Sequence, residues 1–255
     1  MESLWQVIRN EVEQRSANEP SLQPYLHDAV LQWHDGCAAL SHMLARRLSC
    51  TSCPFEFCRS LVARAVLEDG AIGSAAAADL RAVVARDPAC REFHLPFLFY
   101  KGFHALQIHR VAHWYWRQGL RTTAYLIQHR SNEALAIDIH PAARIGSGVM
   151  LDHGTGFVAG ETAVVGNDVS LLHGVTLGGT GKQCGDRHPK VRDGASIGAG
   201  AKILGNIEIG AGARIGAGSV VLGAVPRAQT AVGVAARLVH RRPACKNEPA
   251  TEPSL

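Results

Sequence analysis

Apolar residues follow two different patterns along the chain, and the change falls near residue 137. Before it they stand three and four positions apart, the spacing of one face of an amphipathic helix. This spacing predicts helices over 27–48, 55–69, 74–87 and 103–129, the last broken near Gly119. We therefore expect an all-helical domain over residues 1–137.

From Ile139 onward a small aliphatic residue recurs at every sixth position. Neither an α-helix nor an alternating strand has this period, whereas a solenoid whose coil has three six-residue sides does. Residues 138–240 are therefore predicted to form a parallel β-solenoid in which thirteen hexads keep one register, with a single gap in the series. The inward series is Ile139, Ile145, Leu151, Phe157, Ala163, Val169, Val175, Val191, Ile197, Ile203, Ile209, Ile215 and Val221.

One interruption of the series separates Val175 from Val191 by 16 residues, which is one hexad plus ten. About ten residues within 178–190 are therefore expected to leave the coil as a loop. Because functional residues concentrate on loops that a rigid scaffold presents, this loop is a candidate site. Its ionisable residues are Asp186, Arg187, His188 and Lys190.

Composition narrows the class of protein. The chain has 255 residues, 47% hydrophobic and 19% charged, which are globular values. Its net charge of +4 is spread without a basic stripe, so no nucleic-acid partner is expected. No segment has the length and apolarity of a membrane span, and the acidic start lacks the basic region of a signal peptide. A cytoplasmic protein without a membrane partner is expected.

Two groups of metal-ligand residue types do not complete a recognisable site. Cys50, Cys53 and Cys58 lie close together in the sequence, but a zinc site needs four ligands. His109 and His113 are four residues apart, but the stretch lacks the glutamate of the HExxH motif and is interpreted as a polar helix face. Seven cysteines, an odd number, favour free thiols over disulfides. No metal is predicted.

Several motifs together are similar to those of one enzyme family. They are RDPA (86–89), KGFHALQ (101–107), DIHPAARIG (138–146), LDHGTG (151–156), GETAVV (160–165), GVTLGGTGK (174–182) and GDRHPK (185–190). The set resembles the serine O-acetyltransferases, members of the hexapeptide-repeat acyltransferase superfamily. The resemblance implies an α+β chain in which a helical domain precedes a left-handed parallel β-helix with an extruded loop. It also implies acetyl transfer from acetyl-CoA, as co-substrate, to L-serine in the first step of cysteine biosynthesis, with no tightly bound cofactor.

The chemistry of that reaction explains which residues the resemblance singles out. A serine hydroxyl must lose its proton as it attacks a thioester, so the reaction needs a general base, and histidine suits neutral pH. The resemblance assigns His153 as the base and Asp138 as the carboxylate that orients it.

Binding of the amino acid requires acceptors for its ammonium group and donors for its carboxylate. The resemblance assigns Asp87 and Asp152 to the ammonium group, and Arg187 with His188 to the carboxylate. It places the acetyl donor against Gly178, Gly179, Thr180, Ala201, Lys202, Arg214 and Ala217, with small residues beside the pantetheine arm and basic ones near the phosphates.

Oligomeric state and partners follow from the same resemblance. A homotrimer or a dimer of trimers is expected, with acyl-donor clefts between subunits and with L-cysteine as a feedback inhibitor. Residues 241–255 are polar and contain proline, which predicts a flexible tail. Many family members dock such a tail into O-acetylserine sulfhydrylase through a terminal isoleucine, whereas this chain ends in Leu255.

Three other interpretations remain at this point. An O-acyltransferase for homoserine or a sugar would keep the prism and His153 but differ in the carboxylate-binding loop. A γ-type carbonic anhydrase would use zinc between subunits, although the histidine spacing here does not match that family. A non-catalytic scaffold for the sulfhydrylase would need no intact set of site residues.

Overall fold

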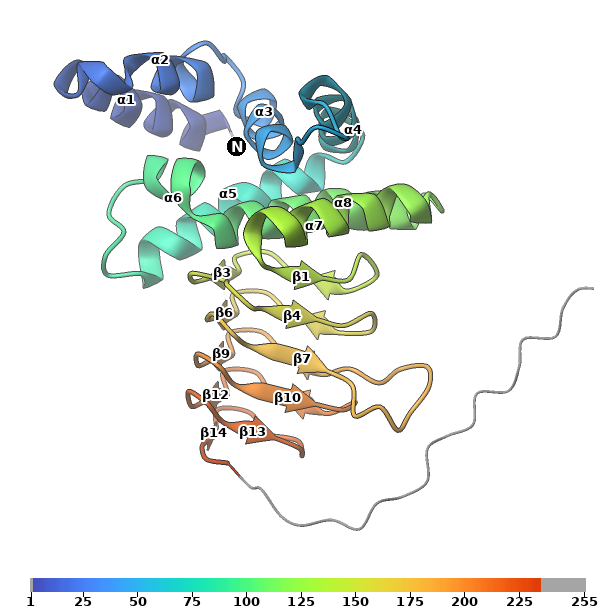
Figure 1. Ribbon diagram of the computed structural model, residues 1–255. Coiled ribbons are helices and arrows are strands. Elements are labelled where there is room, and N and C mark those ends of the chain that lie inside the picture. The colour runs from blue at the N-terminus through green and yellow to red at the C-terminus, as the bar shows by residue number, and fades with distance from the viewer. Residues whose placement is uncertain (1, 235–255) are drawn as a thin grey trace, which may run out of the picture.

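The computed structural model describes residues 2–234, in which a layer of helices covers one end of a β-prism (Figure 1). The predicted tail 241–255 lies outside the described residues. The helices are α1 (Glu2–Asn18), α2 (Gln23–Leu26), α3 (Gly36–Leu48), α4 (Phe55–Glu68), α5 (Gly70–Arg86), α6 (His94–Phe99), α7 (Lys101–Arg117) and α8 (Arg121–Leu135), with short turns of 3-10 helix at Pro20–Leu22 and of π-helix at His27–Leu31.

The helix boundaries agree with the sequence in one place and differ in another. The expected break of 103–129 separates α7 from α8 at Gly119, whose φ of 78° suits glycine. A single helix over 27–48 is wrong, because a new helix begins after Asp35. The Asp35 side chain accepts hydrogen bonds from the backbone N–H groups of Cys37 and Ala38, which is an N-cap.

Within residues 2–234, fourteen short strands form three parallel sheets, the faces of a left-handed parallel β-helix (Figure 1). The first face has the order β1-β4-β7-β10-β13, the second β2-β5-β8-β11 and the third β3-β6-β9-β12-β14. The strands are β1 (Asp138–Ile139), β2 (Arg144–Ile145), β3 (Met150–Leu151), β4 (Val158–Ala159), β5 (Val164–Val165), β6 (Ser170–Leu171), β7 (Thr176–Gly178), β8 (Lys190–Val191), β9 (Ser196–Ile197), β10 (Lys202–Leu204), β11 (Glu208–Ile209), β12 (Arg214–Ile215), β13 (Val220–Val221) and β14 (Thr230–Ala231).

Each six-residue side of a coil typically turns two residues toward the prism interior. The sequence pattern identified only one of these two residues. On the side that contains β6, for example, both Val169 and Leu171 are fully buried. Of the thirteen predicted inward residues, twelve are buried and Ile145 is partly exposed. The prediction that all thirteen hexads keep one register is nevertheless wrong. Up to Leu151 the predicted residues occupy the second inward position of each side, which lies in the strand. From Phe157 to Val175 they occupy the first inward position, which lies just before the strand, and from Val191 they occupy the second position again.

The strand register shows where the coils are longer. Stacked partners such as Val158 and Thr176 are 18 residues apart in the sequence. Asp138 and Val158 are 20 apart, so the corner between β3 and β4 holds two extra residues. Thr176 and Lys202 are 26 apart, so the loop after β7 adds eight residues rather than the expected ten.

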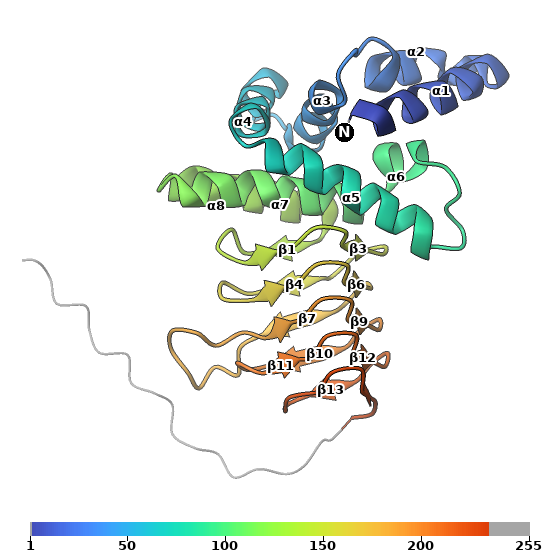
Figure 2. The ribbon, with the colours of Figure 1, turned by 180° about the vertical axis from the view of Figure 1, so that it is seen from behind.

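Two groups of polar contacts, one of them buried, connect the helical layer to the first coils. α5 lies across the end of the prism (Figure 2). Arg86, at the end of α5, donates to the Gly148 carbonyl and pairs with Asp168 at 3.0 Å. Asp79 accepts a hydrogen bond from the Val149 N–H and pairs with Arg110 of α7 at 2.8 Å. Burial raises the pKa of Asp79, and the Arg110 guanidinium opposes that shift.

Within residues 2–234, no helix combines the length and apolarity that a membrane crossing requires. The same stretch brings together no group of three or more His, Cys, Asp or Glu side chains arranged to hold a metal ion. The six cysteines among these residues are all free thiols.

Candidate active site

The corner between β3 and β4 presents His153 to solvent. His153, Gly154 and Gly156 all have positive φ, at 54°, 70° and 72°. This conformation is uncommon for a residue with a side chain, and such residues cluster at functional sites. The His153 side chain is 73% exposed, and its Nε2 lies 3.7 Å from Asp152 Oδ2, beyond hydrogen-bond distance.

A pocket of about 410 Å³ joins this corner to the helical layer. Three of the residues assigned from the sequence line it together: Asp87, Asp152 and His153. Three further polar residues, Tyr100, Lys101 and Thr155, were not assigned from the sequence, although the motifs KGFHALQ and LDHGTG include two of them. The remaining lining residues are Ala89, Phe99 and Gly102.

Asp87 combines a structural role with a place in the pocket. It follows α5, and its Oδ1 accepts a hydrogen bond from the Ala89 N–H at 2.9 Å, which forms a turn. Burial, followed by the nearby Cys90 and Asp87, raises the pKa of Tyr100 to about 12. The phenol therefore stays protonated at neutral pH and can donate to the Asp87 carboxylate.

Close backbone packing explains how the helical layer reaches the corner. A Cβ atom on Gly102, in the first turn of α7, would lie 1.9 Å from the Leu151 carbonyl oxygen. Only glycine allows this approach. The contact sets Lys101 beside the segment that carries Asp152 and His153.

The loop after β7 organises a second group of polar residues around Thr162. The Thr162 hydroxyl accepts hydrogen bonds from the N–H groups of Arg187 at 3.0 Å and His188 at 3.1 Å, and it lies 2.8 Å from His188 Nδ1. Lys190 donates to the Thr162 carbonyl at 2.7 Å. Thr162 was not assigned from the sequence, although it lies within GETAVV.

Electrostatic effects distinguish the two loop residues assigned to the carboxylate. Arg187 Nη2 pairs with Glu161 Oε2 at 2.8 Å, and this hydrogen bond lowers the pKa of Glu161. Burial, then the charges of Arg187 and Lys190, lowers the pKa of His188. His188 is therefore neutral near pH 7, and Arg187 is the group of this pair that supplies positive charge.

Asp138 is not hydrogen-bonded to His153 within the described chain. Its Oδ1 accepts a hydrogen bond from Gln128 of α8 at 2.6 Å. Its register partner on the next coil is Val158, the first strand residue after the corner. The expected pairing with His153 is thus not formed in this structure, although Asp138 lies on the strand beside the corner.

The His153 corner and the loop after β7 lie at opposite ends of the strands of one sheet. The segment 152–157 precedes the first residue of β4, whereas the loop follows the last residue of the parallel neighbouring strand β7 (Figure 1). One chain therefore does not assemble Asp87, Asp152 and His153 with Arg187 and His188 in one pocket.

The residues assigned to the acetyl donor lie further along the prism. Gly178 ends β7, and Gly179 and Thr180 begin the loop. Lys202 Nζ donates to the Gly174 carbonyl at 2.6 Å and to Thr176 Oγ1 at 3.1 Å. Arg214 and Ala217 are exposed. Ala201 is fully buried, so its side chain fills the prism interior and does not face a donor, contrary to expectation.

A helical layer on a hexapeptide prism, with an exposed histidine at a lengthened corner, defines an acyltransferase of the hexapeptide-repeat class. The family model described as "Serine acetyltransferase, N-terminal" matches residues 4–108, and the one described as "Bacterial transferase hexapeptide (six repeats)" matches residues 188–223. A curated relative, the serine acetyltransferase of Escherichia coli strain K12, is 52% identical over 94% of this chain and 88% of its own length. The chain belongs to the serine acetyltransferase family.

Solved structures of the family are similar throughout. The Neisseria gonorrhoeae serine acetyltransferase in complex with serine superposes with a TM-score of 0.88 at 49% identity, covering 92% of this chain and 97% of that one. The Brucella abortus serine acetyltransferase in complex with coenzyme A superposes with a TM-score of 0.90 at 46% identity, covering 96% of this chain and 98% of that one. A complex of a serine acetyltransferase with cysteine is also among the similar structures.

Proposed function

We propose that this chain transfers the acetyl group of acetyl-CoA to the hydroxyl of L-serine, giving O-acetyl-L-serine and CoA in the first step of cysteine biosynthesis. The observation that carries the proposal is the pocket that places exposed His153 beside the carboxylates of Asp87 and Asp152. Relatives of about 50% identity named serine acetyltransferase, together with the serine and coenzyme A complexes, support the same reaction.

His153 acts as the general base. It takes the hydroxyl proton while the serine oxygen attacks the thioester carbonyl, and the imidazolium then returns the proton to the departing CoA thiolate. Backbone N–H groups near Gly178 and Gly179 stabilise the oxyanion that forms in between. Asp138 orients the imidazole, because its strand borders the corner and the exposed ring is free to turn toward it.

The serine ammonium group binds Asp87 and Asp152, and the carboxylate binds Arg187 and His188. Neutral His188 can donate one hydrogen bond to the carboxylate from Nε2, because its Nδ1 accepts one from the Thr162 N–H. Arg187 must exchange its pairing with Glu161 for the substrate. A planar guanidinium suits a carboxylate because it can donate two parallel hydrogen bonds.

These two groups meet between subunits of a homotrimer. When three prisms turn the β1-β4-β7-β10-β13 sheet toward a common axis, the His153 corner of one subunit faces the loop edge of the next. This arrangement accounts for the separation of the two groups within one chain. Pairing of trimers through the helical layer gives the hexameric alternative.

Acetyl-CoA lies in the cleft between prisms, along the coils below His153. Gly178, Gly179 and Thr180 contact the thioester end, and Ala217 borders the pantetheine arm. Exposed Arg214 and the partly exposed Lys202 supply positive charge for the phosphates. Ala201 contributes through its backbone position only, because its side chain is buried.

L-cysteine inhibits by occupying the serine site, since it carries the same ammonium and carboxylate groups. The cysteine complex within the family supports this regulation. The division at residue 137, docking of the tail ending at Leu255 to O-acetylserine sulfhydrylase, and cytoplasmic location stay predictions from the sequence.

A thiol assay tests the reaction directly. Purified protein with L-serine and acetyl-CoA should release free CoA, and homoserine and threonine should support markedly less release. Serine-independent thioester hydrolysis alone would contradict the proposal. Faster turnover of homoserine than of serine would instead favour the alternative acyltransferase.

A further inference from the structure

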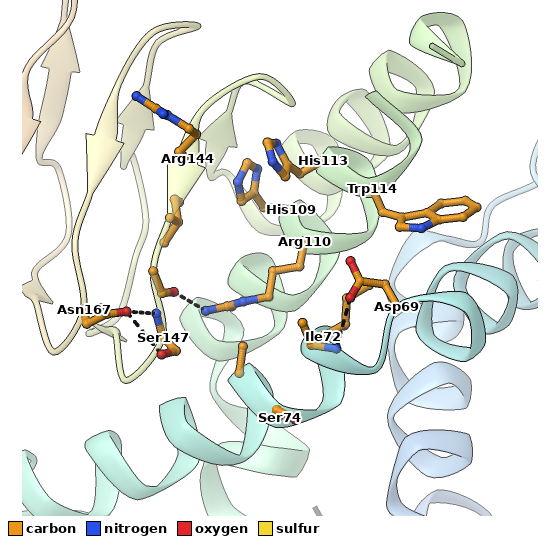
Figure 3. Close-up of a pocket in the computed structure, with 14 residues that line it drawn as sticks. Asp69, Ile72, Ser74, His109, Arg110, His113, Trp114, Arg144, Ser147 and Asn167 are labelled. Atoms are coloured by element: carbon orange, nitrogen blue, oxygen red, sulfur yellow. Dashed lines mark hydrogen bonds between the residues drawn. The ribbon is translucent and has the colours of Figure 1, made fainter. Parts of the chain in front are cut away.

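Of the two groups of metal-ligand residue types in the sequence, the histidine pair is part of the packing between α7 and the first coil. His109 and His113 project from α7 toward β2, where they line a cavity (Figure 3). His109 is buried, and His113 Nδ1 donates to the Pro141 carbonyl at 2.7 Å. The predicted polar helix face is therefore wrong, because His109 is buried against the first coil.

The other group consists of three free thiols where α3 connects to α4. α7 and α8 lie between this connection and the prism (Figure 1). Cys53 is 6% exposed and Cys58 is 3% exposed, whereas Cys50 is partly exposed. Cys50 is therefore the thiol of this group that a molecule in solution can reach.

Backbone hydrogen bonds bring Cys50 and Cys53 to the separation of a disulfide. The Cys50 N–H donates to the Cys53 carbonyl at 2.9 Å, and the Cys53 N–H donates to the Cys50 carbonyl at 3.1 Å. Two residues that exchange both bonds in this way have Cα atoms about 5.5 Å apart. This separation is within the range of disulfides, so the pair can be bridged with little movement of the backbone.

Polar groups around Cys50 favour its thiolate, which is the reactive form of a cysteine. Its Sγ lies 3.3 Å from the Ser52 hydroxyl, which can donate to it. Arg130 of α8 is held beside the turn, because its guanidinium donates to the Leu48 carbonyl at 3.0 Å and to the Ser49 carbonyl at 3.5 Å. The hydrogen bond from Ser52 lowers the pKa of Cys50, and the Arg130 charge acts in the same direction.

Cys58 lies close to the pair but is in a different environment. It is in the first turn of α4, and its Sγ donates to the Cys53 carbonyl at 3.5 Å. Burial raises the pKa of the Cys58 thiol, so less of it is ionised at neutral pH. Cys58 therefore holds the turn in place and is not the attacking group.

We propose that Cys50 and Cys53 form a reversible thiol–disulfide exchange site for small disulfides. The Cys50 thiolate attacks one sulfur of a disulfide R–S–S–R, which forms a mixed disulfide and releases RS⁻, and this takes up a proton. Cys53 then loses its proton and attacks the Cys50 sulfur, which closes the Cys50–Cys53 disulfide and releases the second RS⁻. The two cysteines are oxidised, and one small disulfide is reduced to two thiols. The site lies apart from the His153 pocket, so it does not depend on the proposed function.

Mass spectrometry of the full-length chain with glutathione disulfide tests the proposal. Cys184→Ser and Cys245→Ser together remove an exposed thiol and one outside the described residues, and this double variant is the background for the test. The reduced background chain should lose about 2 Da and release about two equivalents of glutathione, and dithiothreitol should reverse the change. Trypsin yields residues 48–59 as one peptide that contains all three cysteines. After alkylation of free thiols, this peptide should carry one label, on Cys58.

Substitutions in the background chain separate the two steps. Cys53→Ala should stop at a glutathione adduct on Cys50, which adds about 305 Da, because the second thiol is absent. Cys50→Ser should form neither product, and Ser52→Ala should react about two- to fivefold more slowly. Cys37→Ser is the matched control for a partly exposed thiol and should react as the background does, since burial raises the pKa of Cys37. Thermal melting of each reduced variant checks that it is folded.

Four results would overturn the proposal. They are a disulfide between Cys53 and Cys58, a glutathione adduct that persists on Cys50 in the background chain, oxidation of Cys50→Ser at the rate of the background, and no reaction with about 5 mM glutathione disulfide. Because Cys50→Ser and Ser52→Ala change only side chains with access to solvent, they keep the test decisive if Cys53→Ala does not fold.

Discussion

Leu151 and Ala159 occupy equivalent inward positions on consecutive sides of the coil, yet eight residues separate them where six is the rule. The two surplus residues fall in the corner that carries Asp152 and His153. Six residues are enough to complete one side and its corner, so the two added residues project outward from the coil. His153 is exposed because its corner is longer than the others.

Replacing His153 with Ala should lower serine-dependent turnover by about 10²- to 10⁴-fold, because the hydroxyl then has no positioned base. The rate of CoA thiol release at saturating serine and acetyl-CoA measures this. His129→Ala, an exposed histidine on α8, is the matched control and should keep normal turnover. Near-normal turnover of His153→Ala would remove it from the role of base.

Arg187→Lys should raise the KM for serine by about 10- to 100-fold with a smaller change in kcat. Lysine keeps the charge but cannot donate two parallel hydrogen bonds to a carboxylate, nor reproduce the Glu161 contact. Initial rates over a range of serine concentrations separate the two constants. Arg91→Lys, at an exposed position, controls for the exchange itself. An unaltered KM would place the substrate carboxylate elsewhere.

Gly102→Ala should destabilise the protein by about 1–3 kcal/mol and lower its Tm by several degrees. The new Cβ would lie 1.9 Å from the Leu151 carbonyl oxygen, so α7 must move away from β3. Differential scanning calorimetry measures the shift. Gly70→Ala is the control, since nothing lies within 4 Å of its added Cβ. Equal melting temperatures for the two variants would show that α7 and β3 can move apart at residue 102 without loss of stability.

Buried histidines should make stability fall between pH 6.5 and 5. Burial lowers the pKa of His104 to about 4, whereas an unfolded histidine titrates near about 6.5. In this window the unfolded state binds a proton that the native state does not, so each such histidine reduces stability by about 1.4 kcal/mol per pH unit. Denaturant unfolding at both pH values gives the slope.

The substitution His104→Leu isolates this effect. Although it removes the 2.8 Å hydrogen bond to the Phe97 carbonyl and lowers stability at every pH, it should flatten the slope by about one proton. His129→Leu, on the exposed surface of α8, controls for the exchange of histidine for leucine. An identical slope in His104→Leu would mean that His104 is protonated in the native state.

Sequence periodicity predicted the solenoid and its interior but concealed the lengthened corner. Each side of the coil buries two residues, and the six-residue spacing from Leu151 leads to Phe157, which is the other inward position of the next side. The two extra residues of the corner therefore left no gap in the hydrophobic pattern. The loop was visible because its eight extra residues exceed a hexad. Side-chain contacts such as Gln128 with Asp138, and the burial of His109 against the first coil, depend on tertiary packing that no local pattern encodes.

The placement of the two insertions at opposite edges of one sheet has a genetic consequence. In the proposed trimer each chain would carry one half of two different sites, so a subunit defective in one half could still supply the other half to its neighbour. Subunits with His153→Ala, refolded together with subunits carrying Arg187→Gln, should regain serine-dependent activity that neither population has alone. Of the three sites in a mixed trimer, one would combine an intact His153 with an intact Arg187, so two inactive chains would complement each other.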